Sequence, residues 1–399
     1  KCGKLLDAKT GIVAEKQNIL IKGNQVISIS SSVSAADSVI DLSNYFVMPG
    51  MIDCHTHVLL QGDITSEDYD VQVLKESIPY RTIRATKSAE KSLMNGFTTI
   101  RDLGTEGAGF ADVDIKKAIN KGVTNGPRMI VSTLAMNTTG HYPLKASDYA
   151  WELKFPKGVI EVTGADEARR AVRQQIEQGA DWIKIYADRG YYRLADGSFR
   201  SIPNFTTEEI KAIGDETITS RKKLAAHAMT RDGILAAIKA GASTIEHGSG
   251  MDEECMRVMA EKGIFWCPTL FVNEYVAEGR AKLGSPINLY FQQSIQATFK
   301  KAMKMGVKLA YGTDIGGYDW NLTQAKDFTY FVEWGLSPLQ AIQTATTTAA
   351  ELLGMQGKIG EIKEGAFADI IALKKDPTKD ISALQNIDFV MKDGKVYKH

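Results

Sequence analysis

The chain has 399 residues, of which 44% are hydrophobic and 24% are charged, a composition typical of a folded globular protein. Its 48 basic and 48 acidic residues balance to a formal net charge of +0, which argues against nucleic acid or an anionic membrane surface as a partner. No apolar run approaches the roughly 18 residues that a membrane span needs. We therefore expect a partner that is a small molecule, with no nucleic acid and no membrane involved.

The first stretch of the chain, residues 4–46, consists of short apolar runs separated by the turns AKTG and KGNQ, which predicts short strands. Residues 357–399 follow the same pattern, so we expect both ends to form one small β-sandwich from residues 1–48 and 357–399. The sequence opens at Lys1 rather than at a methionine, which indicates that a preceding segment was removed. A periplasmic or secreted location and a cytoplasmic one both stay open.

Between these ends, residues 49–356 alternate short apolar runs with amphipathic helical stretches, which is the rhythm of parallel βα units. Helices are expected at 165–178 and 231–240, and after the threonine cap in PNFTTEE at 203–209. Eight strand-like runs occur in this part: VMPGMIDCHTH, FTTIRDLG, RMIVSTLAM, DWIKIYAD, LAAHAM, STIEHGS, FWCPTL and KLAYGTD. This count predicts an α/β fold, a (β/α)8 TIM barrel that carries the terminal β-sandwich.

Four of the six histidines lie at the ends of these runs. His55 and His57 end the first run, His227 the fifth and His247 the sixth, while Asp314 ends the eighth. The C-terminal ends of the strands surround the active-site mouth of a TIM barrel, and residues two apart on a strand face the same side. A single strand histidine is usually a hydrogen-bonded core residue. Imidazole and carboxylate groups gathered on one rim are instead the ligands that zinc prefers, so the pattern predicts a metal site.

Lys184 lies in the fourth run between the apolar Ile183 and Ile185. An ammonium group has no lone pair for a metal ion, and burying it without a partner is costly. Taken alone, it could reach outward from the strand end or pair with a carboxylate. Its place on the same rim favours another hypothesis, in which the lysine takes up carbon dioxide and becomes a carbamate that bridges two metal ions.

Five motifs in this order resemble the amidohydrolase superfamily: HTH in MPGMIDCHTH, the lysine of IKIY, AAHA, IEHG and YGTD. Within it, the chain resembles the branch of Xaa-Pro dipeptidase (prolidase)-like and carboxypeptidase-like metal-dependent amide hydrolases. The similarity covers nearly the whole chain, including RDLG at 101–104 and GEIKEGAFADIIAL near the end. The five ordered motifs together with the split β unit make the resemblance specific.

The resemblance implies a centre of two divalent metal ions, preferably zinc. Its ligands would be His55 and His57 at the more buried ion, His227 and His247 at the second, carbamylated Lys184 bridging both, and Asp314 at the first. A hydroxide shared by the ions would attack an amide carbonyl, and Asp314 would carry the proton to the leaving nitrogen. The predicted function is amide hydrolysis of a dipeptide or N-acyl amino acid, of the prolidase, carboxypeptidase or amidase type. A homo-oligomer also fits the resemblance.

Two pocket residues are expected from their spacing along the strands. Tyr186 follows Lys184 by two residues, so we expect it in the same mouth. Many relatives carry an aromatic residue shortly after the fifth-strand histidine. This chain has Met229 two residues after His227 instead, and a methionine there suits an apolar or aromatic group of the substrate.

Further contacts are expected on loops and after strands. His141, in the loop NTTGHYP, is a candidate catalytic residue that would hydrogen-bond the substrate carbonyl oxygen or the oxyanion, the alternative being a solvent-exposed histidine. A substrate with a free carboxylate calls for an arginine. Arg231 is the candidate, with Arg189 and Arg193 as others, and each could equally be a surface arginine.

Other functions stay open at this point. A mononuclear-metal deaminase or an imidazolone-type cyclic amide hydrolase of the same superfamily would not need a bridging lysine, and such deaminases place a glutamate where this chain has Thr230 and Arg231. A non-catalytic relative would be expected to lose ligands, whereas all six positions are present here. The aromatic-bearing segments 188–203 and 271–301 could shape the pocket or contact another subunit.

Overall fold

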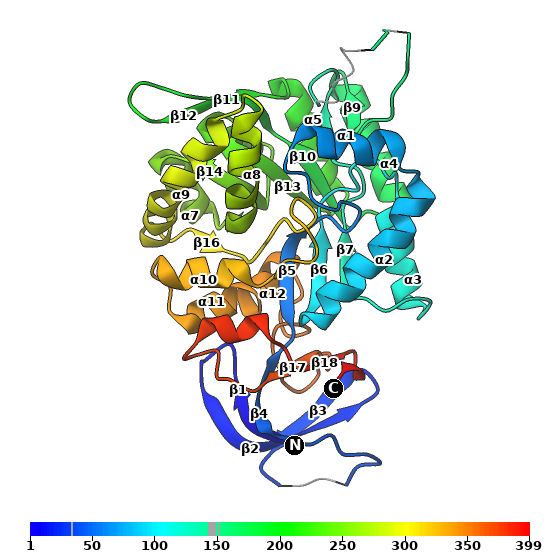
Figure 1. Ribbon diagram of the computed structural model, residues 1–399, viewed down its shortest axis with the longest axis vertical. Coiled ribbons are helices and arrows are strands. Elements are labelled where there is room, and N and C mark those ends of the chain that lie inside the picture. The colour runs from blue at the N-terminus through cyan, green and yellow to red at the C-terminus, as the bar shows by residue number, and fades with distance from the viewer. Residues whose placement is uncertain (33–34, 143–148, 151) are drawn as a thin grey trace.

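The chain consists of a barrel and a smaller β unit, and both termini lie in the smaller unit (Figure 1). The structure is a computed structural model that describes residues 1–32, 35–142, 149–150 and 152–399.

The smaller unit is one seven-stranded sheet in the order β19-β18-β17-β4-β1-β2-β3. Its strands are β1 Cys2–Leu6, β2 Val13–Lys22, β3 Gln25–Ser30, β4 Leu42–Pro49, β17 Ile370–Leu373, β18 Phe389–Lys392 and β19 Lys395–Lys398. The antiparallel pairing of β17 with β4 joins the two ends of the chain. Val26 and Ile370, which come from distant strands, share one apolar cluster. The predicted β unit from both termini is therefore present, as a single sheet around one core.

The barrel strands are parallel and follow the predicted order. They are β5 Met51–Thr56, β6 Phe97–Asp102, β7 Arg128–Val131, β8 Met136–Thr138, β10 Trp182–Tyr186, β13 Lys223–Thr230, β14 Thr244–Gly250, β15 Phe265–Cys267 and β16 Lys308–Leu309, with β9 Ile160–Val162 beside β8. The third predicted run is split into β7 and β8, and only two residues of the eighth form a strand. All eight predicted positions carry strands, and the α/β TIM-barrel prediction is confirmed.

Helices surround these strands. They are α1 Ser66–Lys75, α2 Ile78–Met94, α3 Ala111–Asn120, α4 Ala165–Gln178, α5 Thr207–Thr219, α6 Arg231–Lys239, α7 Glu253–Lys262, α8 Leu270–Lys282, α9 Ile287–Lys304, α10 Lys326–Glu333, α11 Pro338–Thr344 and α12 Thr347–Leu353. Thr206 caps α5 in a reciprocal box with Glu209, as the sequence predicted. The antiparallel hairpin of β11 Asp188–Arg193 and β12 Phe199–Pro203 projects at the upper left of Figure 1.

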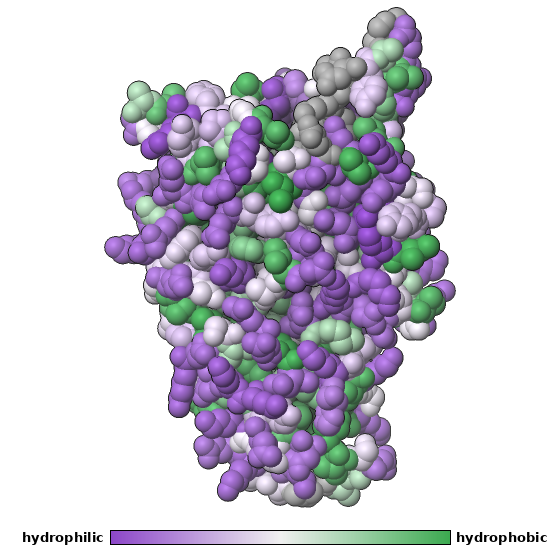
Figure 2. Space-filling view, viewed as in Figure 1, coloured by the Kyte–Doolittle hydropathy of each residue, from purple (hydrophilic) through white to green (hydrophobic). Residues whose placement is uncertain are grey.

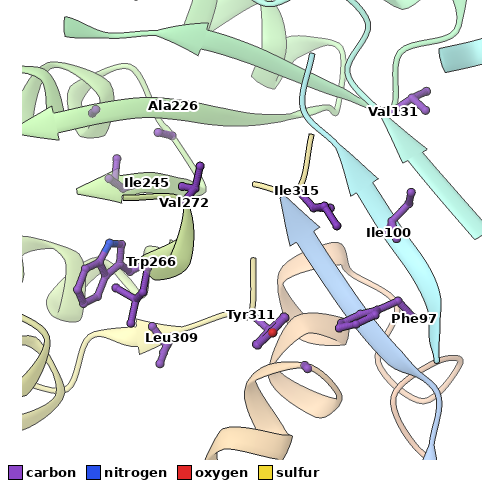
Figure 3. Packing of buried hydrophobic residues seen from close by; sticks show 14 of the residues in the cluster. Phe97, Ile100, Val131, Ala226, Ile245, Trp266, Val272, Leu309, Tyr311 and Ile315 are labelled. Carbon is purple, nitrogen blue, oxygen red and sulfur yellow. The ribbon is translucent and has the colours of Figure 1, made fainter. Parts of the chain in front are cut away.

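The core of the barrel lies between its strands and the surrounding helices, and Figure 3 shows part of it. The ring of Tyr311 stacks on Phe328 with a centroid distance of 4.0 Å and on Phe97 at 5.8 Å. Trp266 is fully buried, and its indole N–H donates to the backbone oxygen of His247 at 2.7 Å. Burying one such side chain contributes about 1.5–3 kcal/mol. Core packing therefore also holds the backbone at a predicted ligand.

Polar side chains dominate the face of the molecule in Figure 2, with apolar residues in small separate groups among them. Within the described part of the chain, no helix combines the length and apolar character that crossing a membrane would take.

Candidate metal centre and active site

Three predicted ligands converge at the C-terminal end of the barrel strands. The Nε2 atoms of His55 and His57 lie 3.3 Å apart, and Oδ1 of Asp314 lies 3.6 Å and 3.3 Å from them. One ligand atom from each of the three lies within 4.8 Å of the others, a grouping that could hold a metal ion. The Nδ1 atoms are already engaged, at 2.9 Å by Glu246 for His55 and at 2.9 Å by the backbone oxygen of Gly104 for His57. These contacts orient both rings so that Nε2 faces the shared position.

His227 on β13 and His247 on β14 lie beside this group. Their ring centroids are 4.5 Å apart, and the His247 ring is 5.0 Å from that of His55. Nδ1 of His247 hydrogen-bonds the hydroxyl of Thr269 at 2.7 Å, while Nε2 of His227 meets the hydroxyl of Tyr191 at 2.8 Å. The four predicted histidines therefore share one location.

Lys184 on β10 reaches the same location and is only 1% exposed. Its Nζ atom lies 5.8 Å from the ring centroid of Tyr186 and makes no hydrogen bond or ion pair with any residue that the structure describes. Burial lowers the pKa of its ammonium group, against the neighbouring carboxylates of Glu246 and Asp314. A buried amine without a partner is a costly arrangement.

A buried ion pair supports the site from inside the barrel. A guanidinium nitrogen of Arg101 lies 2.8 Å from Oε1 of Glu246, and both side chains are 0% exposed. Nε of Arg101 donates to the backbone oxygen of Cys54 at 2.6 Å, and the guanidinium packs 4.5 Å from the ring centroid of Trp182. Burial alone would raise the pKa of Glu246, but Arg101 and the hydrogen bond from His55 outweigh it and lower that pKa. Glu246 thus joins the barrel interior to the ring orientation of His55.

Left-handed backbone conformations gather at the site. The φ angles are 50° at Glu106, 68° at His247, 46° at Thr269 and 60° at Asp314. Each such conformation costs a side-chain-bearing residue about 1–3 kcal/mol and persists only where the surroundings hold it. The Asp314 amide donates to the backbone oxygen of His55 at 2.7 Å, which holds this turn. The eighth strand has already ended at this point, so a strained turn rather than a strand presents Asp314.

The pKa values of the four histidines and Asp314 favour the binding of a metal cation. Burial lowers the pKa of His55 to about 4 and that of His227 to about 3, and it also lowers the pKa of His247. Burial likewise opposes a charge on His57, but Asp314 outweighs it and raises the pKa of His57 to about 9. The histidines in turn outweigh burial at Asp314 and lower its pKa to about 2. The imidazoles of His55, His227 and His247 are therefore neutral beside the ionised carboxylate. His57 would give up its proton to a bound cation, so the donor set fits a divalent ion such as zinc.

These side chains line a pocket of about 210 Å³. Two predicted wall residues, Tyr186 and Met229, lie in it, and the hairpin contributes Tyr191. Helices α8 and α9 supply further wall residues: Val272, Asn273, Val276, Arg280 and Asn288. The segments 188–203 and 271–301 therefore both contribute to the pocket.

The structure places His141 outside this pocket wall. Its side chain is exposed, and Nε2 lies 3.2 Å from a guanidinium nitrogen of Arg189. The next residue of the same loop, Tyr142, lines the pocket and donates to Glu106 at 2.6 Å. The loop thus reaches the site through the tyrosine rather than the histidine, since His141 lies at the end of a turn and contacts Arg189 instead.

Arg231 also departs from the expected placement. It begins α6, and its guanidinium lies 3.1 Å from Asp252 and against Glu254, both at the start of α7. It is not among the pocket residues, because these two carboxylates hold it on the outer side. Arg280 is the arginine that lines the pocket among the residues that the structure describes. No local pattern marked Arg280, whereas Glu106, just after the second strand, followed the same strand-end rule that found the histidines.

The sequence matches the model of the amidohydrolase family over residues 46–397. The chain belongs to this family, as its ordered motifs predicted, and is a hydrolytic enzyme acting on amide bonds. The family is metal-dependent, and the group of His55, His57 and Asp314 is a candidate metal site.

Several known proteins are similar over most of the chain. Ochratoxinase from Aspergillus niger is 33% identical over 382 residues, which cover 88% of this chain and 75% of that protein. A crystal structure of a Xaa-Pro dipeptidase with methionine bound in its active site is 35% identical, with a TM-score of 0.87 over 100% of this chain and 98% of the other. A prolidase complexed with N-methylphosphonate-L-proline is 29% identical, with a TM-score of 0.86 over the same shares.

Proposed function

We propose that this enzyme is a binuclear metal-dependent hydrolase that cleaves the amide bond of a dipeptide or an N-acyl amino acid. The observation that carries the proposal is the convergence of His55, His57 and Asp314 in one pocket with two further histidines and a buried lysine. This lysine makes no hydrogen bond or ion pair with the residues that the structure describes. The similarity to a Xaa-Pro dipeptidase supports a dipeptide as the substrate.

The proposal assigns the donor groups to two metal ions. His55, His57 and Asp314 would hold one ion, His227 and His247 the other, and carbamylated Lys184 would join them. When bound, two divalent ions lower the pKa of a water molecule towards neutrality and polarise an amide carbonyl. Carbamylation would also turn this buried cation into an anion whose charge the two metal ions would neutralise when bound, which offsets the cost of burying it.

Asp314 is the group best placed to move the proton. Its carboxylate is 15% exposed towards the pocket, and its low pKa of about 2 keeps it ionised and able to accept a proton. It would return that proton to the nitrogen that leaves when the amide bond breaks. The strained turn at Asp314 holds the carboxylate at this position.

The substrate carboxylate would bind Arg280 at the mouth of the pocket. The guanidinium lies 3.8 Å from Asp63, beyond hydrogen-bond distance, and its side chain is 38% exposed. It makes no hydrogen bond with the described residues, so its donors are available for a carboxylate. Met229 and Tyr186 would contact the substrate side chains.

The function is tested by incubating zinc-reconstituted protein with a panel of dipeptides and N-acetyl amino acids and following release of the free C-terminal amino acid. We expect release from some members, and the C-terminal amino acid that is released fastest would show which side chain the pocket prefers. Ammonia from heterocyclic amines, with no amino acid released from any member, would instead establish the deaminase alternative and contradict the proposal.

The carbamate is tested separately from activity. Wild-type protein equilibrated with ¹³C-bicarbonate should show a carbamate carbon by NMR, and Lys184→Ala should lose both this signal and most of the bound metal, because the bridging anion is gone. Lys223→Ala is the matched control, since Lys223 lies on the neighbouring strand β13 and bonds the backbone oxygen of Leu352 at 2.5 Å. A signal that persists in Lys184→Ala would show that the modified residue is another one.

A further inference from the structure

Glu106 is a buried carboxylate in the pocket wall that the proposed hydrolysis does not use. It follows the second barrel strand, is 3% exposed and has a left-handed backbone. Arg81, itself 1% exposed, holds this turn by donating to the backbone oxygens of Thr105 and Glu106 at 3.2 Å and 2.8 Å. The position of Glu106 is therefore built into the barrel.

Three tyrosine hydroxyls converge on this carboxylate. Tyr69 and Tyr142 donate to Oε2 at 2.9 Å and 2.6 Å, and Tyr186 donates to Oε1 at 3.0 Å. Burial, together with the charge of Glu106, raises the pKa of all three phenols well above the usual value, so they stay protonated and donate. All four side chains line the pocket.

The three hydroxyls are neutral, so among the described residues Glu106 has only a long ion pair for its negative charge and no charged group within hydrogen-bond distance. The nearest cationic candidate is His57, whose Nδ1 lies 3.7 Å from Oε1 and already bonds the backbone oxygen of Gly104. No lysine or arginine among the described residues forms an ion pair with Glu106. A carboxylate offers about four lone-pair positions, and three are filled, so one acceptor position stays open beside the candidate metal centre.

Resting on the proposed function, we infer that Glu106 and its three tyrosines bind the free α-ammonium group of the substrate, which makes the enzyme a dipeptidase rather than an N-acyl amino acid hydrolase. The ammonium would give this buried carboxylate a charged donor at its open acceptor position. The rings add to this, because Tyr142 lies 5.2 Å from Tyr186 and 5.9 Å from Tyr69 between centroids, and aromatic faces attract ammonium groups.

An N-acyl substrate offers nothing to this position. An acetyl group carries no N–H where a glycyl residue carries its ammonium, so the open acceptor position of Glu106 would stay unfilled. The two ends of a dipeptide would thus meet opposite charges in the pocket, its ammonium at Glu106 and its carboxylate at Arg280.

The test compares two substrates that differ only in the ammonium group, glycyl-Xaa and acetyl-Xaa, with Xaa the residue preferred in the panel. For wild-type enzyme we expect kcat/KM to be about tenfold to a hundredfold higher for glycyl-Xaa, the range of a hydrogen bond between charged groups. Equal kcat/KM values for the two substrates would overturn the inference but would not contradict the proposed amide hydrolysis. Failure to cleave either amide would contradict the proposed function itself.

Variants then assign the preference to Glu106. Glu106→Gln should lower the glycyl-to-acetyl ratio of kcat/KM to about one, because glycyl-Xaa loses more than acetyl-Xaa does, and metal content should stay near wild type. A loss of equal size for both substrates would make Glu106 merely structural and overturn the inference. Arg280→Met should lower kcat/KM equally for both substrates and keep the glycyl-to-acetyl ratio, because both substrates carry the carboxylate. If the ratio fell to about one in Arg280→Met, that result would also contradict the role of Glu106.

A matched control is Glu274→Gln on α8. Glu274 also accepts from a tyrosine, Tyr330, at 2.6 Å, but it is exposed and lies outside the pocket. Its substitution should leave both rates and their ratio unchanged. A change as large as that in Glu106→Gln would show that the ratio responds to the loss of any tyrosine-bound carboxylate, and would overturn the inference.

Discussion

Asp314→Asn should lower kcat for the best dipeptide by about 10²–10⁴-fold, the usual contribution of a positioned acid–base group. The asparagine keeps the size of the side chain and one oxygen, but it cannot accept and return a proton. The carboxylate also lies 3.3 Å from Nε2 of His57, so its loss should weaken metal binding at the first site. Steady-state kinetics and metal analysis of the same preparation separate the two effects.

The control for this prediction is Asp319→Asn. Asp319 lies five residues further along, is only half-buried, and caps the backbone N–H of Asn321 at 2.7 Å without lining the pocket. The Asp319→Asn enzyme should keep the wild-type kcat. An Asp314→Asn enzyme that retains its metal and turns over near the wild-type rate would remove Asp314 from the role of proton carrier.

Glu246→Gln should destabilise the fold by about 3–5 kcal/mol, because it leaves the buried Arg101 without its counter-charge. Both side chains are 0% exposed, so water cannot replace the lost interaction. The substitution also weakens the hydrogen bond that orients His55. The shift is measured as the urea midpoint of the metal-free protein, so that altered metal binding does not contribute.

Two comparisons sharpen this prediction. Asp215→Asn removes an exposed helix pair with Lys211 and should change stability by less than about 0.5 kcal/mol, as exposed pairs contribute little. The double variant Arg101→Met with Glu246→Leu should recover much of the loss, because replacing both partners leaves no buried charge. A Glu246→Gln protein as stable as Asp215→Asn would show that the buried pair does not hold the barrel interior together.

The fold was predictable because its signals are local. The α4 helix spans the predicted 165–178, and Thr206 caps α5, since helical periodicity and capping need only neighbouring residues. The β unit was recognisable at both ends for the same reason. That its strands form one sheet rather than two depends on the long-range pairing of β17 with β4, which no local pattern encodes.

Much of the candidate site was predictable for a related reason. The C-terminal ends of parallel strands meet at one rim, so His55, His57, His227 and His247 could be brought together from their positions in the apolar runs alone. The structure places them in one pocket with Lys184, although their roles as ligands remain a proposal. A strand-end residue such as Glu106 was open to the same reasoning.

The sequence by itself determined the strand order, the family and the clustering of the histidines, because each depends on residue type and spacing along the chain. Only the tertiary structure decided which side chains complete the pocket. Tyr69 and Tyr186 reach Glu106 from 37 and 80 residues away, and Arg280 enters from the last turn of α8. Such contacts depend on how helices and loops pack over the barrel mouth, and that packing is set by many distant residues together rather than by any segment of the chain.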